Sequence, residues 1–306
     1  MINGANDIKE IKKSRSIKNQ HPCFGAAKNK GRIHLPLCPA CNLECAFCRR
    51  SISPDEERPG VSAFILQASS AADYVGRALA LSGSLSVVGV AGPGDCLVGD
   101  SMFRAFREIS HAYPKLLKCI STNGLLLAER SDELIDVGID TLTVTVNAVR
   151  PDILTEIVPA IHYEGVRITG EDAAEILIEN QLRGIAKMAG AGVTIKVNSV
   201  FVPELNGAHI PEIARAVRGA GAEIYNIIPL IPQHRMSGYK APGCEALDAV
   251  RNEAGRYIDV FRHCQHCRAD AVGIPGISEL SGVLAAGGLN ETDGIYMQAE
   301  DVFSHG

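Results

Sequence analysis

The sequence lacks the features that would direct it to a membrane or to a nucleic acid. No stretch reaches the ~18 uninterrupted apolar residues that a membrane-spanning helix needs. The N-terminus, "MINGANDIKEIKK", has no apolar core of the kind found in signal peptides. A formal net charge of -5 and a pI near 6.0 provide no general surface for binding phosphate. We therefore expect a cytoplasmic protein for which neither a membrane nor a nucleic acid is the main partner.

Repeats, low-complexity linkers and changes of composition are also missing, so we expect one large domain. With 306 residues, of which 46% are hydrophobic and 21% charged, the chain can bury a substantial core. Residues 1–32 are locally basic, and we expect this arm to be a solvated tail rather than a docking segment. Its basic residues are Lys9, Lys12, Lys13, Arg15, Lys18, Lys28, Lys30 and Arg32, against Asp7 and Glu10.

Short β-branched runs alternate with amphipathic helical patterns along the chain. Strands that are almost continuously apolar and alternate with helices indicate a parallel sheet covered by helices, and this pattern favours an α/β fold that resembles a TIM barrel. We expect a loose C-terminal extension after residue 276, where glycine is frequent. The predicted strands are 32–38, 85–90, 116–122, 140–147, 192–202 and 222–230, and the predicted helices lie near 70–82, 101–112, 131–137, 171–189, 208–220 and 244–262.

Small and polar residues follow the predicted strands directly. "CNLECAFC" comes after the first strand, "AGPGDC" after the second, "STNG" after the third and "NAV" after the fourth. Because the carboxyl ends of the strands carry the chemistry in a parallel α/β barrel, we expect these loops to form one site.

Three thiols within eight positions, Cys41, Cys45 and Cys48, are the strongest chemical signal in the chain. Because the cytoplasm is reducing, we expect these thiols to be metal ligands or reactive groups rather than members of disulfides. Closed zinc sites and ordinary ferredoxin clusters use four protein ligands, so three thiols would leave one iron of a 4Fe-4S cluster open. A zinc knuckle, or an electron-carrier cluster that takes a distant cysteine, is the alternative.

The CxxxCxxC spacing, with Phe47 before the last cysteine, resembles the motif of the radical S-adenosylmethionine (SAM) superfamily. That resemblance implies a radical SAM fold with N- and C-terminal extensions. It also implies that the open iron binds the methionine part of SAM, and that one electron cleaves the sulfonium to a 5'-deoxyadenosyl radical. Cys41, Cys45 and Cys48 would then be the catalytic cluster ligands.

Further motifs resemble the NifB family of nitrogenase-cofactor assembly enzymes. The resemblance implies that two further 4Fe-4S clusters are fused, with an added sulfur and a carbide from a SAM methyl group, into an 8Fe-9S-C precursor. A cluster donor, an electron donor and a scaffold protein would be the partners. The motifs are "HPCF" (21–24), "GRIHLPLCPACNLECAFC" (31–48), "ERPGV" (57–61), "STNG" (121–124), "VTVNAV" (144–149), "KVNSVFVPELN" (196–206), "NIIPLIPQH" (226–234) and "FRHCQHCRADAVGIPG" (261–276).

The resemblance also implies roles for individual residues. Cys264 and Cys267 would hold one substrate cluster, and Cys23, Cys119 and His34 the other. A structural zinc or a permanent accessory cluster at the CxxC pair, a satisfied core His34 and a buried apolar Cys119 remain the alternatives. The residues expected near SAM are Phe47, Gly92, Gly94, Asp95, Thr145, Asn147, Asn198 and Val200.

One departure from the family pattern concerns the first substrate cluster. NifB proteins usually carry another cysteine before "RPG", whereas "RRSISPDEERPG" has none. Cys38, Cys96 and the carboxylates of Asp55, Glu56 and Glu57 are the candidate replacements, and a related enzyme with a different product stays possible.

The expected organisation is that of the short form of the family, without a C-terminal carrier domain. An N-terminal arm (1–30) would contribute a cluster ligand, a radical SAM barrel would span 31–262, and a CxxC cluster-binding segment with a tail would span 263–306. Two other functions remain open. One is a radical SAM enzyme with auxiliary clusters that acts on an organic or peptide substrate, and the other is a non-enzymatic iron-sulfur carrier or scaffold.

Overall fold

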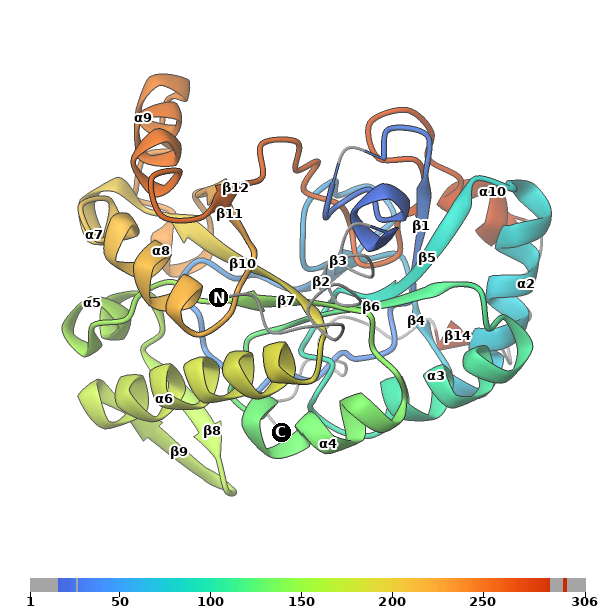
Figure 1. The fold of residues 1–306 in the computed structure, drawn as a ribbon, viewed down its shortest axis with the longest axis horizontal. Helices are drawn as coiled ribbons and strands as arrows, with labels where there is room; N and C mark the ends of the chain where they lie inside the picture. The colour runs from blue at the N-terminus through green and yellow to red at the C-terminus, as the bar shows by residue number, and fades with distance from the viewer. Residues whose placement is uncertain (1–15, 26, 287–293, 296–306) are drawn as a thin grey trace, which may run out of the picture.

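The fold is built around one eight-stranded sheet, seen in a computed structural model that describes residues 16–25, 27–286 and 294–295. The strand order is β12-β11-β10-β7-β6-β5-β1-β13, and the sheet twists steadily from β11 to β1 (Figure 1). All neighbours are parallel except β1 and β13. The strands are β1 (Gly31–His34), β5 (Leu85–Val90), β6 (Leu117–Thr122), β7 (Thr141–Thr145), β10 (Thr194–Phe201), β11 (Ile224–Pro229), β12 (Asp259–Val260) and β13 (Val272–Gly273).

Helices cover the outer side of this sheet because each presents an apolar stripe to it. In α3, Met102, Phe103, Phe106 and Ile109 are buried at helical spacing. Helices α2, α3, α4, α6 and α8 follow one another around the sheet (Figure 1). The main helices are α2 (Ala71–Leu81), α3 (Ser101–Ala112), α4 (Leu127–Asp136), α6 (Gly170–Gly190), α8 (Ile210–Gly219) and α9 (Cys244–Ala254), with the shorter α5 (Pro151–Ile157), α7 (Pro203–Asn206), α10 (Ser281–Ala286), η1 (Ala68–Ser70) and η2 (His234–Met236).

Three small sheets accompany the main one. A hairpin joins β8 (Ala160–Tyr163) to β9 (Val166–Thr169) through Glu164 and Gly165, both of which have positive φ. Two central residues with positive φ are typical of the tight turns that suit antiparallel hairpins. The other pairs are β2 (Ser51–Ile52) with β3 (Val61–Ser62), and β4 (Ile65–Leu66) with β14 (Gly294–Ile295).

The predicted α/β class and the order of βα units are confirmed, but the sheet is open within the described residues. Its edges are the two-residue strands β12 and β13. The predicted helix 244–262 is wrong in its second half, since α9 ends at Ala254 and β12 follows. Helix α4 begins at Leu127, before the predicted 131.

Both chain ends are more ordered than predicted where the structure describes them. Lys18 forms an ion pair with Glu223 (Nζ–Oε2 3.1 Å), and Arg32 is only 3% exposed, so these two members of the basic arm are not solvated tail residues. The other end is not loose between residues 277 and 286, because α10 forms there and Leu284 is buried. Residues 287–293 and 296–306 of the predicted tail, and residues 1–15, lie outside the described residues.

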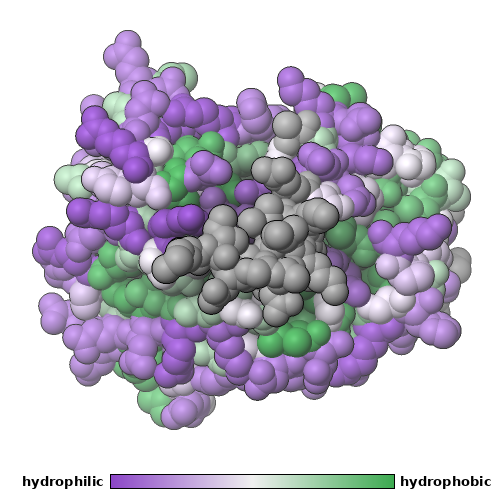
Figure 2. Space-filling view, in the orientation of Figure 1, coloured by the Kyte–Doolittle hydropathy of each residue, from purple (hydrophilic) through white to green (hydrophobic). Residues whose placement is uncertain are grey.

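The face of the molecule shown in Figure 2 is polar around much of its edge. Hydrophilic side chains cover much of the periphery of the face shown in Figure 2, with apolar side chains nearer the middle of the view. Within the described part of the chain, no helix combines the length and the apolar character needed to cross a bilayer.

Candidate active site

One cavity of about 350 Å³ lies at the carboxyl ends of the parallel strands. Parallel strands bring their loops together there, which is why motifs distant in sequence meet. Every residue predicted to hold a cluster or SAM lines it, namely Cys23, His34, Cys41, Cys45, Phe47, Cys48, Gly92, Gly94, Asp95, Cys119, Thr145, Asn147, Asn198, Val200, Cys264 and Cys267. Their individual roles remain predictions.

The three-thiol loop, residues 41–48, follows β1 and is supported by the β8–β9 hairpin. The backbone N–H of Glu44 donates to the Ala160 carbonyl (3.0 Å), and that of His162 donates to the Asn42 carbonyl (2.8 Å). Leu43 forms an isolated antiparallel bridge with Ile161. The hairpin therefore fixes the backbone from which the thiols project.

Burial controls the protonation of these thiols. It raises the pKa of Cys41 to about 12, and it also raises the pKa of Cys45 and Cys48. The positive charge of Arg50 opposes the shift in all three, and the Asn123 amide donates to the Cys41 sulfur (3.8 Å). Burial therefore disfavours the thiolates, whereas Arg50 and the Asn123 amide favour the charged form that a bound metal centre would require.

The donor set fits a cluster better than a single ion. Among residues 16–25, 27–286 and 294–295, no three His, Cys, Asp or Glu side chains are grouped closely enough to hold one metal ion. A closed zinc site would need four such ligands around one point. Three thiols facing one cavity, without a fourth ligand in the loop, match a cubane with one open iron.

The loop after β5 packs directly on the approach to the three-thiol loop. A Cβ on Gly94 would lie 2.0 Å from the Ala40 carbonyl oxygen, so only glycine fits there. The backbone N–H groups of Gly94 and Asp95 donate to the carbonyls of Cys38 (2.7 Å) and Ala40 (2.8 Å). The glycine therefore has a packing role in addition to the contact with SAM expected from the sequence.

Asp95 connects the second and third strand loops. Its carboxylate accepts hydrogen bonds from the Thr122 hydroxyl (2.9 and 3.0 Å) and from the backbone N–H groups of Asn123 (2.6 Å) and Leu97 (2.9 Å). Burial raises the pKa of Asp95, and these hydrogen bonds act in the opposite direction. Both carboxylate oxygens are engaged within the protein, so Asp95 positions the loops.

A second group of thiols lines the same cavity and packs against a different apolar cluster from the three-thiol loop. Cys23, Cys119 and Cys264 pack against a small cluster that contains Phe24 and Phe261. Burial raises the pKa of Cys23 to about 12, and nearby Cys267, Cys119 and Cys264 contribute to this shift while Lys196 opposes it. Residues from the N-terminal arm, from β6 and from the C-terminal segment therefore share one region of the cavity.

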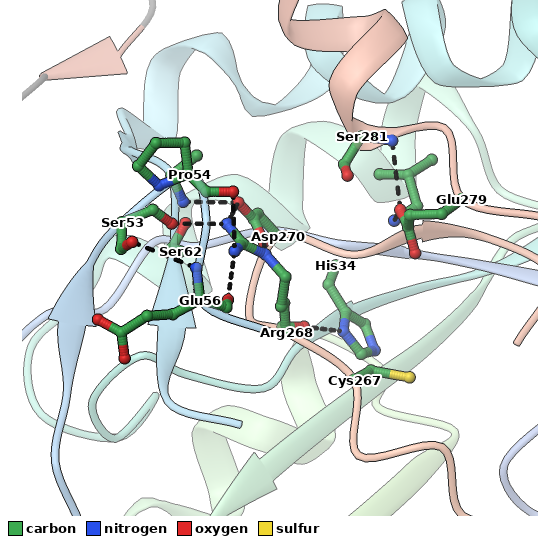
Figure 3. A network of polar contacts seen from close by, with 12 residues as sticks. His34, Ser53, Pro54, Glu56, Ser62, Cys267, Arg268, Asp270, Glu279 and Ser281 are labelled. Atoms are coloured by element: carbon green, nitrogen blue, oxygen red, sulfur yellow. Dashed lines mark hydrogen bonds and ion pairs between the residues drawn. The ribbon is translucent and has the colours of Figure 1, made fainter. Parts of the chain in front are cut away.

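His34 is held in a defined tautomer. Its Nδ1 lies 3.0 Å from the Arg268 carbonyl (Figure 3), so this nitrogen carries the proton and Nε2 keeps its lone pair. Burial lowers the pKa of His34 to about 4, which keeps the ring neutral. A neutral imidazole oriented through its other nitrogen is the usual state of a histidine that binds metal.

Arg268 also holds the loop in which the family cysteine is missing. Its guanidinium donates to both carboxylate oxygens of Asp270 (2.9 Å each) and to the carbonyls of Ser53 (3.0 Å) and Glu56 (2.6 Å) (Figure 3).

None of the five candidate replacements for the missing cysteine lines the cavity. Cys38 and Cys96 are buried elsewhere, and Glu56 pairs with Arg58. Which group replaces the missing cysteine stays an open prediction.

Sequence reasoning missed the cations near the thiols. Arg50 and Lys196 line the cavity, and an Arg32 Nη donates to the Cys267 sulfur (3.4 Å). It also missed Gln181, whose amide nitrogen donates to the carbonyls of Asn123 (2.7 Å) and Thr145 (2.8 Å). Alternation along β10 was an available signal for Lys196, because it shares a strand face with the predicted Asn198 and Val200.

Comparisons with known proteins agree with this geometry. A model of the radical SAM superfamily matches residues 35–217. The chain is 42% identical over 277 residues to the FeMo cofactor biosynthesis protein NifB of Methanocaldococcus infernus, covering 89% of this chain and 91% of that protein. It is 40% identical to the NifB of Klebsiella pneumoniae, covering 84% of this chain and 57% of that protein. Streptococcus suis SuiB bound to S-adenosylmethionine superposes with a TM-score of 0.56 at 14% identity, covering 85% of this chain and 55% of SuiB.

Proposed function

Because the chain belongs to the NifB family of the radical SAM superfamily, we propose that it makes the iron-sulfur-carbide precursor of the nitrogenase cofactor. In this proposal it fuses two 4Fe-4S clusters, adds one sulfur and inserts a carbide that comes from a SAM methyl group. The product would be an 8Fe-9S-C cluster.

One observation carries the proposal. Cys41, Cys45 and Cys48 line the same cavity as a second set of candidate ligands, the thiols of Cys23, Cys119, Cys264 and Cys267 and the imidazole of His34. The alternative enzyme with auxiliary clusters would use a similar ligand set, and the measurement of S-adenosylhomocysteine described below separates the two. Thiolates suit iron-sulfur units, and an incomplete ligand set allows a product cluster to leave.

The chain's own residues bind and orient the reactants. Three thiols of the 41–48 loop would hold the radical cluster, and the amide of Asn123 stabilises one of them through its hydrogen bond to Cys41. Asn147 accepts the backbone N–H of Val200 (2.9 Å), and Asn226 donates to Asn198 (3.1 Å). These bonds fix the side chains that we assign to SAM. When bound, the cluster and SAM supply one-electron cleavage of the sulfonium and a 5'-deoxyadenosyl radical.

The second set of candidate ligands would hold the substrate clusters. Cys264 and Cys267 are assigned to one cluster, and Cys119 and His34 to the other. Cys23 is assigned with Cys119 and His34, although its nearest electrostatic neighbours also include Cys267 and Cys264. The proposal includes a cytoplasmic location, with a cluster donor, an electron donor and a scaffold protein as partners.

Anaerobic reconstitution tests the proposal. The wild-type chain is expected to hold about twelve irons, whereas a single radical cluster would account for about four. Incubation of the reduced protein with SAM should release both 5'-deoxyadenosine and S-adenosylhomocysteine. 5'-Deoxyadenosine without S-adenosylhomocysteine would favour an organic or peptide substrate, and the absence of both would favour a carrier or scaffold.

A further inference from the structure

Lys196 is a buried ammonium on the wall of the substrate half of the cavity. Its side chain comes from the middle of β10, and the residue is only 6% exposed. The ammonium donates to the Cys23 carbonyl (3.1 Å) and lies over the rings of Phe24 (4.7 Å) and Phe261 (5.4 Å). Two rings and one carbonyl therefore hold the charge beside Cys23 and Cys119.

Within the part of the chain that the structure describes, no carboxylate is paired with this ammonium. Arg32, also beside a cavity thiol, pairs with Glu279 (3.1 Å). A buried ammonium is costly unless an opposite charge compensates it, and cation–π contacts recover only part of that cost.

Two thiols lie beside this ammonium. The Cys23 carbonyl accepts its hydrogen bond, and Cys23 and Cys119 both line the cavity and pack against the Phe24 and Phe261 cluster. When an iron-sulfur unit binds, these thiols lose their protons, and a cubane with several thiolate ligands is an anion. The compensating charge then arrives with the bound cluster.

We propose that Lys196 is an anion anchor that retains a negatively charged iron-sulfur unit bound near Cys23 and Cys119. The inference rests on the proposed function, because it assumes that substrate clusters occupy this half of the cavity. It makes Lys196 a binding residue with an electrostatic role. It also predicts that an uncharged residue at 196 stabilises the empty protein and weakens the loaded one.

The test compares K196M with K196R and with a matched control, K187M. Lys187 is an exposed helical lysine whose ammonium pairs with Asp132 (3.0 Å). Each variant is prepared without clusters for thermal unfolding. Each is then reconstituted for iron counting, chelator challenge and redox titration by electron paramagnetic resonance.

K196M is expected to have opposite effects on the cluster-free and the reconstituted protein. Cluster-free K196M unfolds at a higher temperature than the wild type. Reconstituted K196M loses its additional clusters to a chelator on the order of tenfold faster, and their midpoint potentials are more negative, because a charge close to an anion has been removed. K196R stays close to the wild type in iron retention, and the K187M control is unchanged in iron retention and in reductive cleavage of SAM.

The outcomes separate the two proposals. If the wild type holds additional clusters and K196M retains them with unchanged potentials, or if cluster-free K196M is less stable than the wild type, the anchor role is overturned and the proposed function is untouched. If the wild type takes up only the radical cluster, the proposed function fails and the anchor role fails with it.

Discussion

Removing the Arg268 side chain should release the 51–63 segment from the C-terminal segment. Arg268 and Asp270 are 8% and 2% exposed, and two hydrogen bonds join them in a buried ion pair. Asp270 also accepts the backbone N–H of Ala63 (2.6 Å). R268M leaves the carboxylate without its cation and the carbonyls of Ser53 and Glu56 without a donor. Breaking one side of a buried pair typically costs about 3–5 kcal/mol.

Chemical denaturation of the cluster-free protein measures this cost, and limited proteolysis shows whether the 51–63 segment becomes accessible. The control is R150M, since Arg150 and Asp152 form a pair in which both side chains are more than half exposed (54% and 53%). Exposed pairs contribute about 0–1 kcal/mol. A double change, R268M with D270L, should recover part of the loss because it removes the unpaired carboxylate. An R268M protein within about 1 kcal/mol of the wild type would refute the reasoning.

Three further predictions concern the site and its support. C45A should lose about four irons and all 5'-deoxyadenosine formation, whereas C264A should lose substrate-cluster iron and still cleave SAM; equal losses in both variants would contradict the division of ligands. G94A should lower the free energy of unfolding by about 1–3 kcal/mol, because its Cβ would lie 2.0 Å from a carbonyl oxygen, and an unchanged denaturation midpoint would argue against that close contact. His209 donates from Nδ1 to Glu212 (2.8 Å) and accepts the Val149 N–H at Nε2 (3.0 Å), and burial lowers its pKa below 6.5. Its contribution to stability is therefore complete above pH 6.5 and decreases as the pH falls below that value, so denaturation from pH 7 to 5 should show a smaller pH dependence for H209Q than for the wild type.

The fold could be predicted largely from the sequence because its signals are local. Alternating apolar strands and amphipathic helices specify parallel βα units, and α3 spans the predicted 101–112. The hairpin β8–β9 was missed, although alternating residues around Glu164-Gly165 carried its signal. The short edge strands β12 and β13 could not be predicted, since two residues have no periodicity and their pairing depends on distant neighbours.

The site was predicted as a set of residues, but not as a set of contacts. Motif resemblance and the positions of the strand ends predicted one shared site, and the thiols and the residues predicted to bind SAM do line one cavity. The partners of His34 and Asp95 depend on side-chain directions that emerge only when the loops pack. Lys196 was missed because the sequence does not show that its ammonium lies over the rings of Phe24 and Phe261, which come from distant parts of the chain.

The antiparallel pairing of β1 and β13 has a consequence for the reaction. The register pairs of this short ladder are Arg32↔Gly273 and Ile33↔Val272, and the Arg32 guanidinium also donates to the Gly273 carbonyl (2.7 Å). Strand β1 leads into the 41–48 loop, and β13 follows the segment that carries Cys264 and Cys267. This short ladder therefore helps to fix the separation between the 41–48 loop, where the radical would form, and the segment of Cys264 and Cys267, where the substrate cluster would bind. Adding or deleting one residue between Cys267 and Val272 would change that separation while leaving every proposed ligand in the chain.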